Sequence, residues 1–382
     1  MLPSQRELFN IPREVCYFNA AGWSPIPKAV QEAGRAGAMR KGQPWKLEED
    51  FFKGQCDRVR RAAAALIGAD PEDVAIIPSV GYGVSTAAKI LTIPRGSRVL
   101  VLEDDHSSPS LEWLTRAPQQ GFTVETVKRP GDGDWTAAVL DAIERKGAPP
   151  LALVSISSIH WSCGSVIDLD RVAPALRKLG GKLLVDATHG VGVMATDVRR
   201  LDPDFLIFPT YKWVLGPYGR AFLYIAKRNQ EGEPLEQTGF GRRAVSAELS
   251  PYLSDISYVA GARRFDMGER DYFVSLEMAS VGMEMVAHWG AAAITERLAM
   301  LTERLADGLR NSGVRVPERR LRAPHILSLE FPKGMPKQLP ERLAAEGVHA
   351  APRVGRLRIS PHVYNDEADV ERFVEVFRKV AL

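Results

Sequence analysis

The chain has 382 residues, of which 45% are hydrophobic and 25% charged, and it carries a formal net charge of +3. This is the composition of an ordinary globular protein, with neither an apolar run long enough to span a bilayer nor a basic tract for nucleic acid. The first residues lack the basic and apolar segments of a secretory signal, so we expect a cytoplasmic protein that binds neither membranes nor nucleic acid.

Between residues 73 and 226, apolar runs alternate with segments of helical periodicity. The runs are VAIIP, RVLVLED, ALVSISSI, KLLVDA, DFLIFPTY and RAFLYIA, rich in Val, Ile and Leu without strict alternation. Such runs predict strands buried on both faces, and the helical segments between them predict parallel crossovers. We therefore expect an α/β fold with a large, mostly parallel sheet covered by helices.

The pattern changes after residue 227, and the chain exceeds the roughly 250 to 300 residues of one compact core. A glycine- and charge-rich connection precedes residues 271–313, whose apolar spacing predicts one or two long helices. The remaining sequence reads as strand, helix, strand, helix. These features predict an N-terminal arm (1–20), a large α/β domain (21–235), a connection with an interdomain helix (236–295) and a small α+β domain (296–382).

Polar residues stand where several predicted strands end. Asp186 ends KLLVD, Asp105 and His106 follow RVLVLED, and Tyr211 and Lys212 follow LIFPT. Ligands of parallel sheets bind at the carboxyl ends of the strands. The sequence therefore predicts that these side chains meet at one edge of the sheet.

Lys212 and Asp186 have a shared chemical interpretation. A lysine buried among the aromatic residues of TYKW favours a lowered pKa or a Schiff base with a carbonyl cofactor. An acid at another strand end suits the protonated ring nitrogen of pyridoxal phosphate (PLP), whose aldehyde joins a lysine. The alternatives are a solvated surface lysine and an aspartate that caps a helix.

The stretch IIPSVGYGVSTAAKIL predicts a phosphate site, because a strand leads through Ser79, Val80 and Gly81 into a helix of small residues. Glycine lets the main chain approach an anion closely. The stretch matches neither a Walker loop nor GxGxxG, so nucleotide binding is the weaker interpretation.

Six stretches in order are DDHSSPSLEW, SSIHWSCG, LLVDATHGVG, TYKWVLGPYG, GARRFDMGER and RLRISPHVYND. Together they resemble the class V aminotransferases, fold-type-I PLP enzymes that include cysteine desulfurases, isopenicillin N epimerase-like proteins and kynureninase. The resemblance covers nearly the whole chain. It implies an enzyme with PLP as cofactor, an amino-acid-like substrate, and a homodimer whose active sites are shared between subunits.

The resemblance also implies roles for individual residues. Lys212 would hold PLP and move the substrate's α-proton, with His106 stacked on the cofactor ring as the second catalytic residue. Asp186 would pair with the ring nitrogen, and His189 would lie near the phenolic oxygen. The phosphate would be bound by Val80, Gly81, Tyr211 and Thr210, and the substrate's carboxylate by Arg358 and Asn19.

The sequence departs from the family pattern in three places. The segment GVHAAPRVGRLR lacks the mobile cysteine of the desulfurases. The chain's three cysteines, Cys16, Cys56 and Cys163, are widely spaced, which predicts buried thiols and neither disulfides nor a metal site. Trp161 replaces an asparagine near the cofactor. Glu269 replaces the threonine that reaches the neighbouring subunit's phosphate, which leaves Arg270 as one candidate for that contact.

Transamination is the favoured reaction, but the sequence leaves the choice open. The alternatives are a cysteine-type C–S or β-lyase, an amino-acid epimerase, and a catalytically silent partner protein that keeps the fold. The cofactor makes the carbanion and the protein directs it. Four tryptophans either line an aromatic site or belong to the core or an interface: Trp23, Trp45, Trp113 and Trp161.

Overall fold

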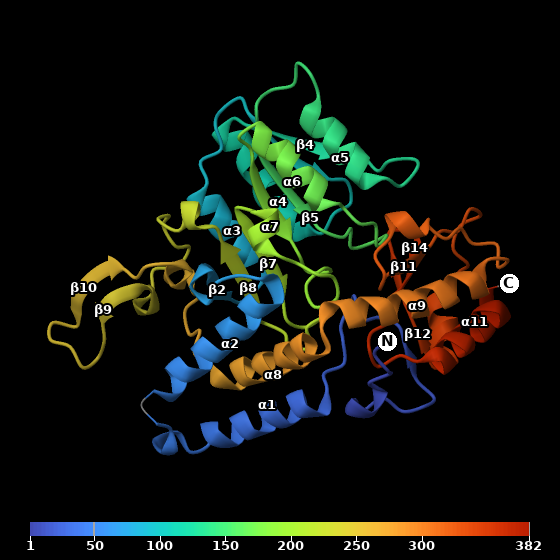
Figure 1. The fold of residues 1–382 in the computed structure, drawn as a ribbon, viewed down its shortest axis with the longest axis horizontal. Helices are drawn as coiled ribbons and strands as arrows, with labels where there is room; N and C mark the ends of the chain where they lie inside the picture. Colours follow the sequence, from blue (N-terminus) through green and yellow to red (C-terminus); the bar gives the residue numbers. More distant parts are fainter. Residues whose placement is uncertain (49, 382) are drawn as a thin grey trace.

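The computed structural model describes residues 1–48 and 50–381, and its centre is a seven-stranded sheet (Figure 1). In spatial order the strands are β2 (Val74–Ile77), β8 (Ala221–Ile225), β7 (Phe205–Pro209), β6 (Lys182–Asp186), β5 (Leu151–Ser157), β3 (Arg98–Leu102) and β4 (Thr123–Val127). All neighbours are parallel except that β8 runs antiparallel to both β2 and β7. The predicted large, mostly parallel sheet is confirmed.

Two strands depart from the simple alternation of strand and helix. β8 follows β7 after residues 210–220, a connection too short for a crossover helix, so β8 returns antiparallel. The apolar runs do not predict β4, because its sequence TVETV is half polar. This strand lies at the edge of the sheet and is only partly buried.

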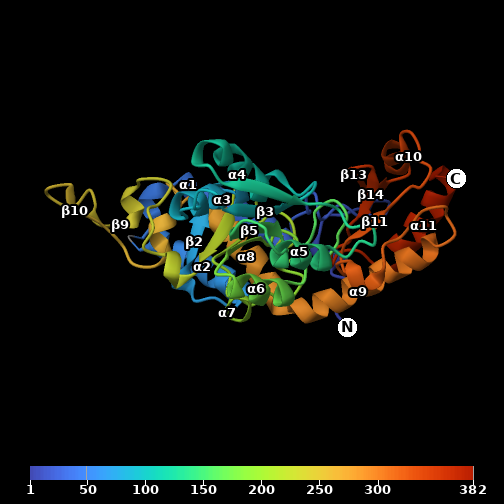
Figure 2. The ribbon, with the colours of Figure 1, turned by 90° about the horizontal axis from the view of Figure 1, so that it is seen from above.

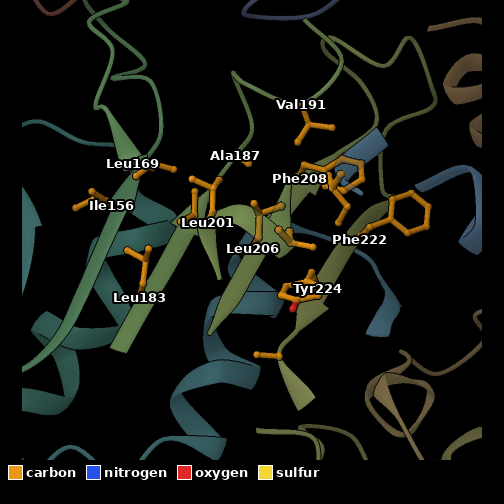
Figure 3. Close-up of a cluster of buried hydrophobic side chains, with 14 of the residues drawn as sticks. Ile156, Leu169, Leu183, Ala187, Val191, Leu201, Leu206, Phe208, Phe222 and Tyr224 are labelled. Atoms are coloured by element: carbon orange, nitrogen blue, oxygen red, sulfur yellow. The ribbon is translucent and has the colours of Figure 1, made fainter. Parts of the chain in front are cut away.

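Helices cover both faces of the sheet because successive side chains of each strand point to opposite faces. Val74 and Ile76 belong to one apolar cluster, whereas Ala75 and Ile77 belong to another. Figure 3 shows side chains of the first cluster along β5 to β8. The first face packs against α2 (Phe51–Ile67), α5 (Trp135–Glu144), α6 (Leu169–Lys178), α7 (Val198–Leu201) and α8 (Phe273–Trp289), and the second against α3 (Val80–Ile90) and α4 (Ser107–Gln120).

The C-terminal part of the chain forms a smaller α+β unit beside the large sheet (Figure 2). Its elements are α9 (Ala291–Leu309), β11 (Leu327–Leu329), α10 (Leu339–Ala345), β12 (Val348–His349), β13 (Ala351–Arg353), β14 (Arg356–Ile359) and α11 (Glu367–Ala381). β14 pairs antiparallel with β11 and β13. The helix break between α8 and α9 lies at Gly290, so the boundary expected at residue 295 falls within α9; the division into domains stays a prediction.

The N-terminal arm packs on the small unit. β1 (Cys16–Tyr17) pairs in parallel with β12, and Asn19 forms a bridge with Ser360. Phe18 contacts Phe373 of α11 edge to face, with ring centres 5.4 Å apart. The two ends of the sequence are therefore joined by both main-chain pairing and a shared apolar cluster.

Two elements lie at the outside of the large unit. α1 (Lys28–Lys41) packs against α8, and the hairpin of β9 (Arg242–Val245) and β10 (Leu253–Tyr258) projects from the body (Figure 1). Exposed apolar side chains gather on and near this hairpin: Phe240, Leu249, Tyr252, Leu253 and Ile256. None of the helices in the described ranges is long and apolar enough to cross a membrane.

Candidate active site

A cavity of about 250 Å³ opens where the carboxyl ends of the parallel strands meet the start of α3. Its lining includes Ser79, Val80, Gly81, His106, Ser157, Trp161, Asp186, Thr188, His189, Tyr211, Lys212, Tyr218 and Arg220. These residues come from segments that follow β2, β3, β5, β6 and β7, and from the turn before β8. The predicted convergence of strand-end residues on one edge of the sheet is confirmed.

Lys212 presents a reactive amine to this cavity. The residue is only 7% exposed, and its Nζ lies 5.4 Å from the centre of the Tyr211 ring. Burial and the positive charge of Arg358 lower the pKa of Lys212, Asp186 acts in the opposite direction, and the resulting pKa is about 7. A large fraction of this amine is therefore unprotonated near neutral pH, the state that attacks a carbonyl carbon.

Asp186 is the last residue of β6, and its carboxylate is buried at the cavity wall. One carboxylate oxygen, Oδ1, accepts a hydrogen bond of 2.9 Å from the main-chain N–H of Thr188. No residue in the described ranges donates to Oδ2 or forms a salt bridge with this carboxylate. A buried carboxylate with one partner is stabilised by a cationic donor placed in the cavity.

His189 is a neutral hydrogen-bond donor toward the cavity. Burial, reinforced by the charges of Lys212 and Arg358, lowers its pKa well below the usual value. The indole N–H of Trp213 donates to Nδ1 of His189 at 3.1 Å, which leaves the ring proton on Nε2. His325 Nε2 donates to the His189 carbonyl at 2.7 Å and fixes the main chain. His189 belongs to the motif LLVDATHGVG, whereas Trp213 lies in the motif TYKWVLGPYG and His325 in neither. The tertiary fold brings the three residues together.

His106 caps the start of α4 and is an exposed residue at the cavity wall. Its Nδ1 accepts from the main-chain N–H of Ser108 at 3.4 Å, and partial desolvation of the ring lowers the pKa of the imidazole. The ring lies edge-on to Trp161, with centres 5.9 Å apart. Asp105 holds this turn, because its carboxylate accepts from the N–H of His106 and from Ser157. The arrangement fits a flat ring placed against His106.

The start of α3 forms an open cradle for an anion. Ser79 caps the helix by accepting from the N–H of Tyr82 at 3.2 Å. The first N–H groups of a helix, here those of Val80 and Gly81, have no partner within the helix. A side chain added at Gly81 would meet nothing closer than 3.9 Å. These groups fit a phosphate at a helix N-terminus.

Arg220 is a cavity residue that the sequence motifs do not predict. Ile77 of β2 is paired with Ala221 of β8, so the next pair along the two strands is Pro78 and Arg220, beside the cradle. The guanidinium is 3% exposed and donates to Ser275 Oγ at 2.7 Å. Its other acceptors are also neutral, and no carboxylate within the described residues forms a salt bridge with it. A buried cation without a counter-ion is stabilised by an anion in the cavity.

Thr210 has a different role from the expected phosphate contact. The residue is fully buried and does not line the cavity. Its hydroxyl lies against the carbonyls of Pro217 and Arg220, the latter at 3.2 Å, so its one proton is used by the main chain. The structure assigns Thr210 to holding the turn before β8, whereas Tyr211 lines the cavity as expected.

Arg358 and Asn19 lie beside the cavity rather than in its lining. Arg358 of β14 is 1% exposed, its Nη1 donates to the Trp161 carbonyl at 2.6 Å, and its Nε has no partner. Burial, with the charge of Arg353, lowers its pKa to about 9. Asn19 pairs with Ser360, two residues beyond Arg358, and its buried Oδ1 has no partner. Unpaired polar atoms at both residues fit a polar group of a substrate.

The segment that departs from the family pattern is held within its own chain. Glu269 is exposed and has a positive φ of 51°. Arg270 forms a salt bridge with buried Asp266 and lies 4.9 Å over the Phe240 ring. The same carboxylate binds Arg60 at 2.7 Å. Arg270 is thus already paired, which argues against its serving as the phosphate donor in trans.

All three cysteines are buried and unpaired, as expected. Cys163 is 2% exposed and does not line the cavity. Burial raises its pKa, but the hydrogen bond and charge of His160 outweigh this and lower the pKa to about 6. No cysteine of the described chain is therefore placed to take sulfur from a substrate in the cavity.

The four tryptophans divide between core and surface. Trp113 is buried in the core, and Trp45 is exposed. Trp161 lines the cavity, and Trp23 stacks on Tyr218 with ring centres 4.8 Å apart. Since Tyr218 lines the cavity, these two tryptophans, and not all four, contribute aromatic surface near it.

Comparison with known proteins places this geometry in a family. The model of the family Aminotransferase class-V matches residues 16–373. The chain belongs to the class-V aminotransferase family. Family membership confirms the predicted enzyme class and implies PLP and an amino-acid substrate.

Relatives of this class-V chain have several reactions in their names. It is 25% identical to the uncharacterized aminotransferase YcbU of Bacillus subtilis, over 92% of this chain and 89% of that protein. It is also 25% identical to the isopenicillin N epimerase of Amycolatopsis lactamdurans, over 98% of each. Among solved structures, an apo cysteine desulfurase from Thermococcus onnurineus superposes with a TM-score of 0.84 at 22% identity, covering 98% of this chain and 97% of that one. The likeness confirms the fold-type-I architecture.

The residues of the class-V site fit PLP. Lys212 has the low pKa that a bond to the aldehyde requires, Asp186 offers a carboxylate oxygen to a cationic ring nitrogen, and the α3 cradle offers N–H groups to phosphate. His189 donates from Nε2, as a phenolic oxygen requires. These donors suit a flat, phosphorylated pyridine.

The pH dependence of cofactor attachment tests the state of Lys212. When PLP is added to the apoprotein, the attachment rate should rise with pH through about 7 and level off above, because only the unprotonated amine attacks. Stopped-flow absorbance measures this profile. Arg358→Gln removes a charge that lowers the pKa of Lys212, so its midpoint should move to higher pH. A midpoint near that of an ordinary lysine would contradict the assignment.

Proposed function

We propose that the protein is a PLP-dependent aminotransferase that removes the α-proton of an amino acid and delivers a proton to the cofactor. The supporting observation is that Lys212, with its pKa of about 7, shares one cavity with Asp186 while no cysteine of the described chain reaches it. Bound there, PLP would supply the electron sink for the bond to Cα. The residues in the described site would have the roles that the family resemblance implies. These residues are Lys212, His106, Asp186, His189, Val80, Gly81, Tyr211, Arg358 and Asn19.

The protein's own groups would divide the work. Arg358 holds the α-carboxylate and so orients the Cα–H bond toward Lys212. Lys212 Nζ, once free, takes that proton and returns it at another atom. Asp186 keeps the ring nitrogen charged, and Arg220 adds charge beside the phosphate cradle. The ring of His106 would lie against the face of the cofactor, and His189 would donate to its phenolic oxygen.

The titratable groups of the cavity favour transamination over epimerisation by two bases. The pKa of Tyr211 is raised to about 12 by burial, and that of His189 is far below the usual value. With His106 assigned to the face of the cofactor ring, Lys212 is the base that this proposal uses, and its pKa is about 7. A single base that exchanges a proton between two carbons on one face is what transamination needs.

An amino-acid panel tests the reaction. The holoenzyme should convert amino acid and keto acid pairs and should release the corresponding keto acid in single turnovers. Production of pyruvate with sulfide from cysteine or cystine would instead establish a C–S lyase, and exchange of the α-proton with racemisation would establish an epimerase. A protein that binds no PLP would support the catalytically silent alternative.

A homodimer with shared active sites is part of the proposal. The exposed apolar side chains around the β9–β10 hairpin support it, because a lone two-stranded hairpin is marginally stable. Arg270 is engaged by Asp266 of its own chain, so we do not assign it a contact across the dimer. The positive charge beside the phosphate cradle comes from Arg220 of the same chain. Sedimentation of the holoenzyme should give twice the chain mass, and a monomer with full activity would contradict sharing.

Substitution of Arg358 separates substrate binding from cofactor binding. Arg358→Gln should weaken amino-acid binding about 10- to 100-fold, because a charged hydrogen-bond pair contributes about 1.5 to 3 kcal/mol. PLP affinity should change little. Spectral titrations of the holoenzyme and of the apoprotein measure the two constants, with Arg358→Lys testing whether the two-pronged geometry matters. Equal loss of both affinities would overturn the carboxylate assignment.

A further inference from the structure

Three arginines lie on one face of the small sheet. In the antiparallel register, Arg353 of β13 is paired with Arg356 of β14, and Arg358 is paired with Ala351 and with Ser328 of β11. Paired residues, and residues two apart on a strand, share a face. This face meets the loop at the cavity, since Ser328 Oγ donates to the Ser162 carbonyl at 3.2 Å and Arg358 to that of Trp161.

The three arginines have different partners. Arg356 is neutralised by a salt bridge with Glu330, and Arg358 is held by the Trp161 carbonyl. Arg353 is half-buried, and its one hydrogen bond goes to the carbonyl of Pro352 at 2.7 Å. No carboxylate within the described part of the chain lies within salt-bridge distance of Arg353. Its guanidinium therefore has donors free for a ligand.

Arg353 lies beside Arg358 on the small sheet. Burial lowers its own pKa, and its charge in turn lowers the pKa values of Arg358 and of Lys212. In the strand register, Arg353 lies two residues along β13 from Ala351, the partner of Arg358, so Arg353 and Arg358 share one face of the small sheet. Val354 and Gly355 follow with positive φ angles of 45° and 73° and form the tight turn that ends the hairpin. Arg353 is thus fixed at the outer end of the strand that faces Arg358.

The proposed function gives partners to Asp186, Arg220 and Arg358 but none to Arg353. Asp186 faces the ring nitrogen, Arg220 lies beside the phosphate cradle, and Arg358 takes the α-carboxylate. Arg353 adds a positive charge next to Arg358, an arrangement that costs free energy until an anion binds. We propose that Arg353 forms a second anion subsite, so that the preferred substrate is an amino acid whose side chain ends in a carboxylate or a similar acidic group. The inference rests on the proposed function.

Paired acidic and neutral amino acids test this subsite. Spectral titration of the holoenzyme should show that glutamate or aspartate binds at least about tenfold more tightly than glutamine or asparagine, the value of a charge-assisted hydrogen bond. Arg353→Gln should bring the ratio close to one while leaving the affinity for the neutral amino acids within about threefold. Arg353→Lys should keep part of the preference. Arg356→Gln is the matched control, because it lies on the same face but is engaged by Glu330, and it should keep the full ratio.

A second readout needs no catalysis. Glutarate should raise the thermal unfolding temperature of the holoenzyme more than butyrate does, and Arg353→Gln should remove the difference. Equal weakening of acidic and neutral ligands in this variant, or a wild-type protein without preference, would overturn the subsite. Borohydride fixation separates this result from failure of the proposed function: a fixed cofactor without acidic preference refutes the subsite alone, whereas a protein that binds no PLP refutes both.

Discussion

Lys212→Ala is expected to abolish covalent attachment of PLP and to reduce turnover at least about 10⁴-fold, because both the bond to the aldehyde and the proton transfer are lost. Borohydride reduction followed by peptide mass spectrometry should find the cofactor mass on the Lys212 peptide of the wild type and on no peptide of the variant. Lys227→Ala, at an exposed lysine after β8, is the control and should retain both properties.

Lys212→Ala should also change how the free energy of unfolding depends on pH. The pKa of Lys212 is about 7 in the folded apoprotein and near 10.5 in the unfolded chain, so between these values the unfolded chain binds more protons. The free energy of unfolding of the wild-type apoprotein should therefore rise with pH from about 7 to 10 relative to that of Lys212→Ala. Parallel profiles for the two proteins, measured by urea unfolding, would show that Lys212 is not titrating as described.

Asp186→Asn is expected to reduce turnover at least about 10³-fold and to weaken PLP binding, because the substitution preserves shape but removes the charge that stabilises a protonated ring nitrogen. The variant keeps an acceptor for the Thr188 N–H, so its fold should be retained. Turnover and equilibrium titration with PLP measure the two effects. Asp186→Glu restores the charge and should recover part of the cofactor affinity if charge is the cause.

Asp186→Asn should also move the attachment profile in the direction opposite to Arg358→Gln. Asp186 raises the pKa of Lys212, so its neutralisation should shift the midpoint to lower pH. Two substitutions that remove charges of opposite sign near one amine then give opposite shifts. Shifts of the same sign would mean that the variants act through a change of structure rather than through charge.

Local sequence patterns predicted the parts of the site that depend on strand ends. Lys212 and Asp186 end apolar runs, and the rule for parallel sheets is sufficient to bring them together. The antiparallel return of β8 was not predicted in direction, because an apolar run is the same in either orientation. Arg220 and its position beside the cradle depend on that return, so the sequence offered no signal for it.

Other parts of the site depend on contacts between distant segments. Trp213 and His325 set the tautomer and the main chain of His189 from 24 and 136 residues away. Thr210 precedes Tyr211 in the motif, but the turn at Pro217 uses its hydroxyl. Asn19 was placed by family resemblance alone, and its location beside Ser360 follows from strand pairing that no local pattern encodes.

The pairing of β1 with β12 has a mechanical consequence. Asn19 forms a bridge with Ser360 and Arg358 lies on β14, so both are held by the small unit, whereas Asp186 ends a strand of the large sheet and Lys212 follows another. In the proposed function, the residues that bind the substrate's carboxylate therefore belong to the small unit, and Lys212 and Asp186, which bind the cofactor, belong to the large one. A change in the angle between the two units would change how the substrate's Cα–H bond is directed toward Lys212, and it would act on the hydrogen bonds that join the units, those of Arg358 with Trp161 and of His325 with His189.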